Sequence, residues 1–128
     1  MVQWQKFSRR KSTGGLRNKA RKKRKRELGR YPIETKLSQR KIKKQRVRGG
    51  KSKLKVYSDT HVNVNDGGTT KHLEILEVVH NPSNKDYDRR KIITKGTIVK
   101  TEMGTVRITS RPGQNSVING VVVETEEY

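Results

Sequence analysis

The side chains with the most evident chemical capacity in this sequence are the lysines and arginines of its first 55 residues. Seven of the eight positions from Lys19 to Arg26 are cationic, and Arg9, Arg10 and Lys11 form a second run. A cation that contacts a phosphate releases counterions, and arginine adds bidentate hydrogen bonds and stacking on bases. Cations at this density indicate a polyanionic partner, of which nucleic acid is the abundant one.

Aromatic side chains and glycines lie between these cations. Trp4, Phe7 and Tyr31 could stack on unpaired bases, or they could form a small apolar anchor against the rest of the protein. The sequence leaves both interpretations open. The glycine pairs at positions 14–15 and 49–50 would let the backbone pass close to an RNA surface without side-chain collision.

The other reactive residue types form no catalytic pattern. The segment 49–52, Gly-Gly-Lys-Ser, ends like a phosphate-binding loop, but that motif needs a glycine at position 45, which is Gln45. His61, His72 and His80 lack the spacing of metal ligands, and the sequence contains no cysteine. We therefore expect no enzyme, no catalytic residue, no cofactor and no metal site.

The positive charge is concentrated in one part of the chain. The 128 residues include 32 Lys and Arg against 12 Asp and Glu, a formal net charge of +20. Residues 1–55 carry a net charge of +21 and residues 56–128 a net charge of −1. This division predicts a basic arm on a nearly neutral body. We place the domain boundary between a basic RNA-threading extension at 1–30 and a single small domain at 31–128.

Neither a membrane-spanning segment nor a secretory signal is expected in this sequence. No apolar run approaches the roughly 20 residues that a bilayer requires, and only 28% of the residues are hydrophobic. The first residues lack the apolar region of a secretory signal. We therefore expect no membrane partner.

The extension shows no apolar periodicity. Residues 8–15 are expected to be extended chain, because their two glycines interrupt regular structure. Residues 18–28 have good helix-forming types, with Asn18 as a possible cap and Gly29 as a stop, which suggests one short helix there. Like charges at i,i+4 oppose that helix in water. We expect the segment to be disordered when free and to form a short helix or an extended trace on a polyanion.

The body is predicted to be all-β, a small antiparallel β-barrel of about six strands. Short segments rich in valine and isoleucine alternate with turn residues, as in barrels and sandwiches. Residues 66–68, Asp-Gly-Gly, are expected to form a hairpin turn. Asn119-Gly120 is expected to be a bulge within one strand, because a hairpin there would leave a three-residue stub. The expected extended segments lie at residues 34–37, 41–48, 54–56, 62–64, 73–79, 92–93, 97–101, 105–109 and 116–125.

Seven blocks of sequence, which are spread along most of the length of the chain, occur in an order typical of one family. The blocks are Trp4–Gly15, Ala20–Lys25, Glu27–Arg30, Arg46–Gly50, Asn81–Asn84, Arg89–Gly96 and Thr109–Gln114. They resemble the e-type small-subunit ribosomal protein family numbered eight, which archaea and eukaryotes share. The chain lacks the long central insertion of eukaryotic members and so resembles the archaeal form. Residues 60–71 match only loosely and are expected to be a variable hairpin.

The resemblance implies a structural protein of the small ribosomal subunit, a surface β-barrel whose basic extension threads into ribosomal RNA. It implies small-subunit rRNA and neighbouring ribosomal proteins as partners, no small-molecule substrate, and a monomer within the cytoplasmic ribosome. The alternative is a non-resident ribosome-assembly or nucleic-acid-packaging factor. The residues that we assign to RNA binding are Lys6, Arg9, Arg10, Lys11, Ser12, Thr13, Gly15, Arg17, Lys19, Arg21, Lys22, Lys23, Arg24, Lys25, Arg26, Arg30, Arg46, Arg48, Lys51, Arg89, Arg90, Lys95 and Arg111.

The last four of these residues have a second interpretation. They form a basic group within an otherwise neutral region, and three acids occur near them in the sequence. The group could therefore contact RNA, or it could form ion pairs with Asp86, Asp88 and Glu102.

Overall fold

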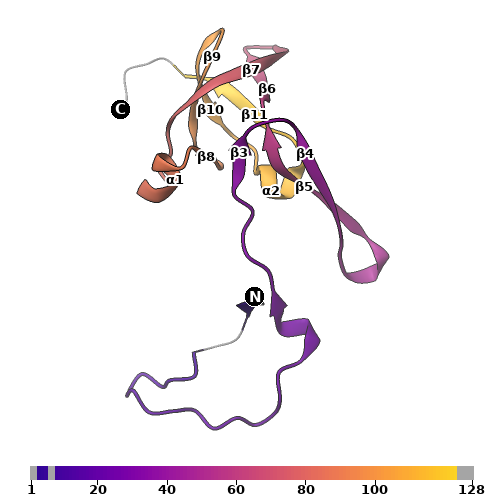
Figure 1. The fold of residues 1–128 in the computed structure, drawn as a ribbon, viewed down its shortest axis with the longest axis vertical. Coiled ribbons are helices and arrows are strands. Elements are labelled where there is room, and N and C mark those ends of the chain that lie inside the picture. The colour runs from indigo at the N-terminus through magenta and orange to yellow at the C-terminus, as the bar shows by residue number, and fades with distance from the viewer. Residues whose placement is uncertain (1–2, 6–7, 124–128) are drawn as a thin grey trace. The chain divides into compact units, whose positions relative to one another are not determined.

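The computed structural model divides the chain into two compact units, Met1–Pro32 and Ile33–Tyr128. It describes residues 3–5 and 8–123, and Figure 1 shows their fold. Lys6, Phe7 and the expected end of the last strand at Thr125 lie outside the described residues. Among the described residues, no helix has the length and apolar composition needed to cross a lipid bilayer.

The first unit is a long loop whose ends are joined by two short strands. Strand β1 (Gln3–Trp4) pairs antiparallel with β2 (Leu28–Gly29), and the Gln5 amide donates to the Glu27 carbonyl at 2.8 Å. A Cβ on Gly29 would lie 2.7 Å from the Gln3 carbonyl oxygen, so this approach of the two strands requires glycine.

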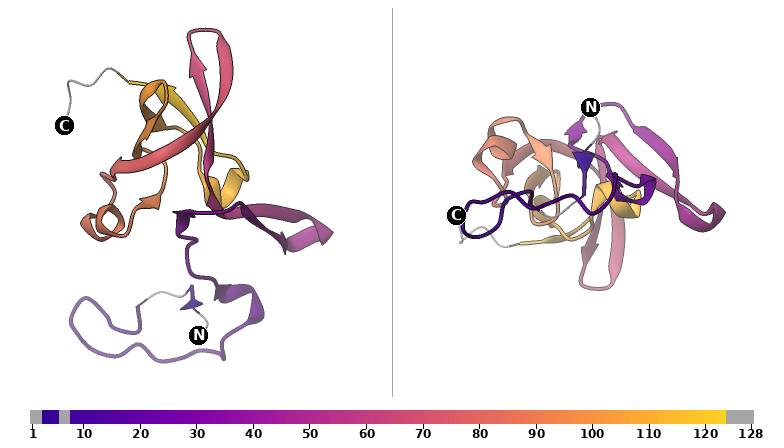
Figure 2. Two further views of the ribbon diagram at one scale, coloured as in Figure 1. Left: turned by 45° about the horizontal axis from the view of Figure 1, so that its top comes forward. Right: turned by 90° about the horizontal axis from the view of Figure 1, so that it is seen from below.

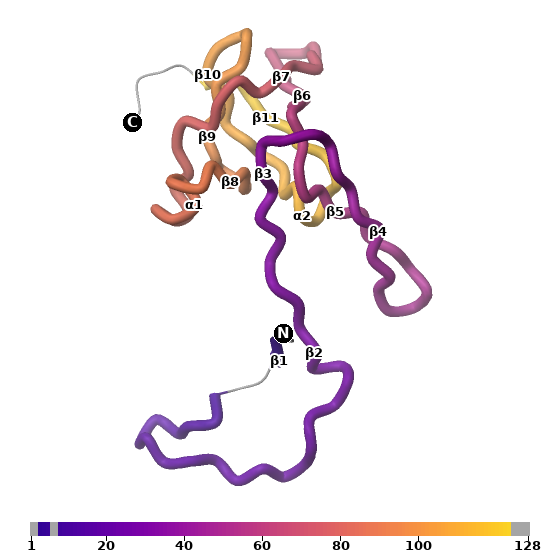
Figure 3. Tube along the Cα trace, in the orientation of Figure 1, coloured from indigo at the N-terminus to yellow at the C-terminus, as the bar shows by residue number. Residues whose placement is uncertain are grey.

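Residues 18–28 do not form the α-helix that their residue types suggest. The chain there is extended, apart from one 3₁₀ turn, η1 (Lys25–Glu27), as the trace in Figure 3 shows. The reason is that a run of like charges opposes helix formation, and the segment has no apolar face to bury.

Residues 8–17 form a tight turn, so the expectation of extended chain over residues 8–15 was wrong. The Arg17 amide donates to the Arg9 carbonyl at 2.8 Å, which holds the two ends of the turn together. Gly14 lies at the reversal with φ of +82°, a conformation that glycine adopts without strain. The glycine therefore permits a defined reversal here.

The second unit contains a closed barrel of five strands in the order β10-β11-β6-β7-β9. The strands are β6 (His61–Asp66), β7 (Thr69–His80), β9 (Ile98–Thr101), β10 (Gly104–Ile108) and β11 (Asn119–Val122). The predicted all-β barrel is confirmed, and the Asp66-Gly67-Gly68 turn joins β6 to β7. All neighbouring pairs are antiparallel except β11 and β6, which are parallel. A closed ring with an odd number of strands cannot be antiparallel throughout.

Valine and isoleucine fill the barrel. In β6, Val62 and Val64 are fully buried while the alternating residues Asn63 and Asn65 are not, which is the period-two pattern of a strand with one face in the core. The core cluster consists of Val62, Val64, Ile75, Val78, Ile93, Val99, Val106, Ile108 and Ile118.

A second sheet of four strands accompanies the barrel within this unit, in the order β4-β5-β3-β8. The strands are β3 (Thr35–Leu37), β4 (Lys41–Arg46), β5 (Ser52–Asp59) and β8 (Ile92–Ile93). A 3₁₀ turn, η2 (Arg48–Gly50), connects β4 to β5. Figure 2 shows that the β4–β5 hairpin extends away from the barrel strands.

Two short helices lie in segments where no helix was predicted. Helix α1 (Lys85–Arg89) follows Asn84, whose side chain accepts a hydrogen bond from the Asp86 amide at 2.9 Å. Helix α2 (Pro112–Asn115) packs against β5. These helices have only five and four residues, too few for a helical period to be visible in the sequence.

The last strand is shorter than predicted. Ser116, with φ of +62°, ends α2, so that β11 starts only at Asn119. Gly120 lies inside β11, which shows that rejecting a hairpin there was correct. The expected bulge is absent, because β11 pairs with β10 in continuous register from Gly120 to Val122.

The buried side chain of Asn81 supports the loop after β7. Its Nδ2 donates to the Ile92 carbonyl at 2.7 Å, and its Oδ1 accepts from the Ser83 amide at 3.1 Å and from Thr94 Oγ1 at 3.2 Å. We predict that Asn81→Ala lowers the free energy of unfolding by about 2–3 kcal/mol, because a buried carbonyl loses its donor. Urea unfolding of the full chain measures this loss.

The control variant for this prediction is Asn84→Ala. Asn84 is exposed and caps α1, so its loss should cost only about 1 kcal/mol. If Asn81→Ala proved no more destabilising than Asn84→Ala, the supporting role of Asn81 would be refuted.

Candidate nucleic-acid interface

The loop of the first unit is rich in cations. Residues 8–26 include eleven Lys and Arg and no acid, and every one of these cationic side chains is exposed. The turn at residues 8–17 carries Arg9, Arg10, Lys11 and Arg17, together with the predicted Ser12, Thr13 and Gly15. The extended segment that follows carries Lys19 and residues 21–26, and Arg30 is exposed after β2.

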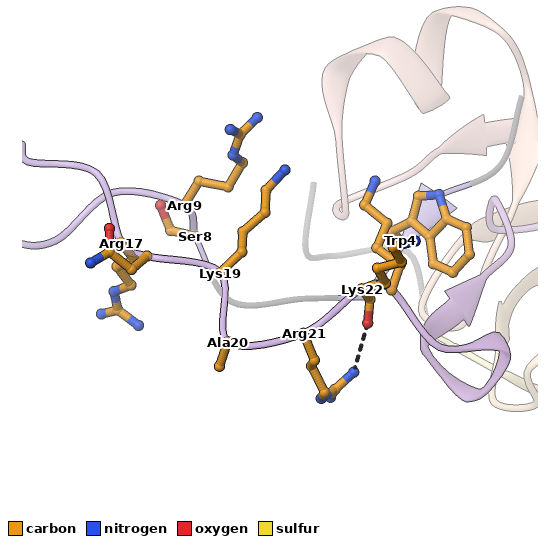
Figure 4. Close-up of a pocket in the computed structure, with 10 residues that line it drawn as sticks. Trp4, Ser8, Arg9, Arg17, Lys19, Ala20, Arg21 and Lys22 are labelled. Atoms are coloured by element: carbon orange, nitrogen blue, oxygen red, sulfur yellow. Dashed lines mark hydrogen bonds between the residues drawn. The ribbon is translucent and has the colours of Figure 1, made fainter.

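Within the first unit, these cations border an open cavity of about 960 Å³. Figure 4 shows Arg9, Arg17, Lys19 and Lys22 among the side chains around it, with the Trp4 ring at one end. The Lys23 ammonium lies 5.1 Å from the centroid of that ring, a cation–π contact. The cavity has the size and the charge to hold a phosphate-bearing chain.

Glu27 is the only acid in residues 1–32, and it orders the cations near it. Its carboxylate forms an ion pair with Arg21 and accepts a hydrogen bond from the Arg24 amide at 3.3 Å. The ion pair joins the extended segment to η1, close to where β2 begins. Glu27 therefore positions part of the cationic loop while leaving its net charge strongly positive.

Trp4 has a defined place in this unit. It lies in β1 opposite Leu28, and it is 36% exposed. Tyr31 is 59% exposed. The Trp4 ring thus belongs to the closure of the loop, while part of it stays accessible to a base.

The second group of predicted residues lies in the β4–β5 hairpin. Arg46 ends β4, Arg48 begins η2, and Lys51 follows that turn, so all three are at the free end of the hairpin. Sequence reasoning missed five exposed or half-exposed lysines of the same two strands. These residues are Lys41, Lys43, Lys44, Lys53 and Lys55. The available signal was that residues 41–55 contain eight cations and no acid.

The structure divides the basic half of the chain between the two units. Residues 1–32 have a net charge of +12, and residues 33–55 of the second unit have a net charge of +9. The expectation of one basic arm on a neutral body was therefore wrong. The second unit has a cationic element of its own.

Arg89 and Arg90 form ion pairs, as the second interpretation anticipated. Arg89 pairs with Asp86 at 2.8 Å, and Arg90 pairs with Glu34 and, at 3.4 Å, with Asp86. Hydrogen bonding from Arg89 lowers the pKa of Asp86 from its ordinary value of 3.8, and Glu34 raises the pKa of Arg90. Each arginine keeps exposed surface that a phosphate could reach.

The four cations of this region do not form one cluster. Arg89 and Arg90 belong to the end of α1, which packs on β7 and β8, whereas Arg111 precedes α2, which packs on β5. Lys95 lies in the turn between β8 and β9. Among the described residues, neither Lys95 nor Arg111 has an ion pair, and Glu102 pairs with none of the four.

The histidines do not gather into a ligand set. His61 and His72 stack across β6 and β7 with ring centroids 4.8 Å apart, and His80 lies 3.5 Å from Asp88. Within the described part of the chain, no three His, Asp or Glu side chains group as metal ligands.

Comparison with known proteins gives consistent matches over nearly the whole chain. The family described as ribosomal protein S8e matches residues 4–123. A protein of Nanoarchaeum equitans named small ribosomal subunit protein eS8 is 52% identical over 114 residues, which cover 88% of this chain and 90% of that protein. The proteins of the same name from Staphylothermus marinus and Sulfolobus acidocaldarius are 53% and 47% identical over 119 and 117 residues. These matches cover 90% and 89% of this chain and 92% and 91% of the two relatives.

Proposed function

Because the chain belongs to the ribosomal protein S8e family, we propose that it is a structural constituent of the small ribosomal subunit. In this role it binds and stabilises folded small-subunit rRNA through its N-terminal extension and the basic surface of its barrel unit. A family of structural ribosomal proteins also agrees with a sequence that lacks any catalytic pattern. The chain covers nine-tenths or more of the length of the archaeal relatives, so we assign it to the compact archaeal form.

The observation that carries the RNA-binding part of this proposal is the exposed cationic loop of residues 8–26. Phosphates repel one another where RNA segments converge, and eleven cations without an acid among them can neutralise that repulsion. The loop has little apolar surface with which to bind a protein. The barrel, with its valine and isoleucine core, is the folded body that carries the basic elements of the second unit.

The finer features of the proposal follow from this role. The protein acts as a single copy within the cytoplasmic ribosome, with small-subunit rRNA and neighbouring ribosomal proteins as its partners. A resident protein of this kind needs neither a small-molecule substrate nor a cofactor. The alternative, a non-resident assembly or packaging factor, would use the same cations but would leave the mature subunit.

A sedimentation experiment separates these two functions. We expect the protein to remain with the mature small subunit through sucrose gradients at salt concentrations that remove loosely bound factors, because contacts in a folded RNA–protein particle are partly shielded from salt. Quantification of the protein in the gradient fractions measures its retention. Its appearance on precursor particles alone, or its complete removal by salt, would favour the assembly factor.

A further inference from the structure

The β4–β5 hairpin has the features of an element that is completed by a partner. Both of its strands extend away from the barrel (Figure 1), and β5 is the only extensive neighbour of β4 among the described elements. Ile42 and Leu54 are 39% and 45% exposed on it. A two-stranded ribbon without a core of its own is only marginally stable in water. A partner that packs against the hairpin would therefore stabilise it.

The register of the hairpin assigns its side chains to two faces. Cross-strand partners in an antiparallel pair point to the same side of the sheet. Lys43 pairs with Lys55, and Gln45 pairs with Lys53, so these residues share one face, which we call the lysine face. The Lys53 ammonium also donates to Gln114 Oε1 at 3.2 Å, so α2 lies beside this face.

The opposite face has a different composition. Lys44 pairs with Leu54, and Arg46 pairs with Ser52, so these residues form what we call the mixed face, which Ile42 extends toward the barrel. Cations and exposed apolar side chains alternate there. This combination suits a surface that offers phosphates next to the apolar faces of riboses and bases.

The lysine face includes a pair of like charges that a bound anion would neutralise. Lys43 and Lys55 are directly opposite each other, where like charges destabilise a strand pair. The nearest counter-charges in sequence, Glu34 and Asp59, are paired with Arg90 and with Arg40. A phosphate oxygen between the two ammonium groups would turn this repulsion into two charge-assisted contacts.

We propose that the β4–β5 hairpin is a second RNA-binding limb that lies between two segments of rRNA and holds one on each face. The lysine face binds one segment through its phosphates alone. The mixed face binds the other through phosphates and through apolar contact with riboses or bases. This inference rests on the proposed function, and it adds that the hairpin bridges two RNA segments independently of the N-terminal extension.

Two matched variants of the full chain test the bridge. Lys43→Gln with Lys55→Gln removes two cations from the lysine face, and Lys44→Gln with Arg46→Gln removes two from the mixed face. The control, Lys71→Gln with Lys100→Gln, removes two exposed cations of barrel strands. Hydroxyl-radical footprinting on purified small-subunit rRNA and the salt dependence of the affinity are measured for each protein.

We expect the two hairpin variants to lose protection at two different sets of nucleotides, while the control keeps the full footprint. The slope of log affinity against log salt should become shallower by about 1.4–1.8 in each hairpin variant, the value for two lost phosphate contacts. Loss of the same nucleotides in both variants would overturn the bridge. If both hairpin variants behaved like the control, RNA binding by the hairpin would be refuted, while the proposed function would remain in place. A wild-type chain without affinity for small-subunit rRNA would overturn both.

A third variant separates the chemistry of the two faces. Leu54→Ser should weaken rRNA binding without changing the salt slope, because it removes an apolar contact and no charge. In the free protein, the Lys43→Gln, Lys55→Gln variant should unfold at the same or a higher temperature than wild type, since it relieves a like-charge pair. A lower unfolding temperature would show that the lysines stabilise the fold and would refute their assignment to RNA.

Discussion

Replacing the five cations Lys22, Lys23, Arg24, Lys25 and Arg26 with glutamine is expected to weaken binding to small-subunit rRNA by about 100-fold at 0.1 M salt. Each phosphate contact contributes about 0.7–0.9 to the slope of log affinity against log salt. If only half of the five side chains contact phosphates, the slope changes by about 2, which corresponds to two orders of magnitude at that salt concentration. Filter binding or fluorescence titration across a salt series measures both quantities.

A charge-preserving variant controls for changes in the loop itself. Exchanging lysine for arginine and arginine for lysine at the same five positions keeps the charge, so the affinity should stay within a few-fold of wild type. The free energy of unfolding of the barrel should be unchanged in both variants, because these side chains lie outside the second unit. If the glutamine variant bound rRNA with wild-type affinity, the cationic loop would not be the RNA-binding element.

The sequence located the positive charge correctly but could not show how the fold distributes it. Net charge has no structural period, so the charge count alone grouped residues 1–55 together, although the predicted domain boundary already placed residues 31–55 with the barrel. The alternation of lysines around Ile42 and Leu54 was the signal of a ribbon, yet it lacked the apolar face by which a strand is usually recognised. The residues missed in the candidate interface were the lysines of this ribbon.

The barrel could be predicted because apolar residues recur at the spacing of strands in its sequence. Val62, Val64, Ile75 and Val99 all come from segments expected to be strands, and all are buried. The parallel pairing of β11 with β6 was not predictable, because it follows from closure of five strands and not from any local residue pattern. The turn at residues 8–17 was missed because it is closed by backbone hydrogen bonds, such as the one from Arg17 to Arg9, which leave no pattern in the sequence beyond the glycine at position 14.

At Asn119-Gly120, tertiary packing overrides the local preference of this dipeptide for a hairpin turn. The dipeptide favours a hairpin turn, but in β11 the glycine serves close packing. A Cβ on Gly120 would lie 2.4 Å from Val106 Cγ1 and 3.0 Å from the Arg107 carbonyl oxygen. Val106 is fully buried in the core, so it has no room in which to move.

We therefore predict that Gly120→Ala lowers the free energy of unfolding by about 2–3 kcal/mol, the upper part of the range for overpacking a core. Gly113→Ala is the matched control, because a Cβ there would make only an ordinary contact with Ile33, at 3.6 Å. Adding Val106→Ala removes the methyl group that collides, so the double variant should be more stable than the sum of the two single losses. Urea unfolding of wild type, Gly120→Ala, Val106→Ala and the double variant gives this coupling. Strict additivity, or a Gly120→Ala protein as stable as Gly113→Ala, would show that the strand can shift to admit the methyl group and that close packing does not require glycine.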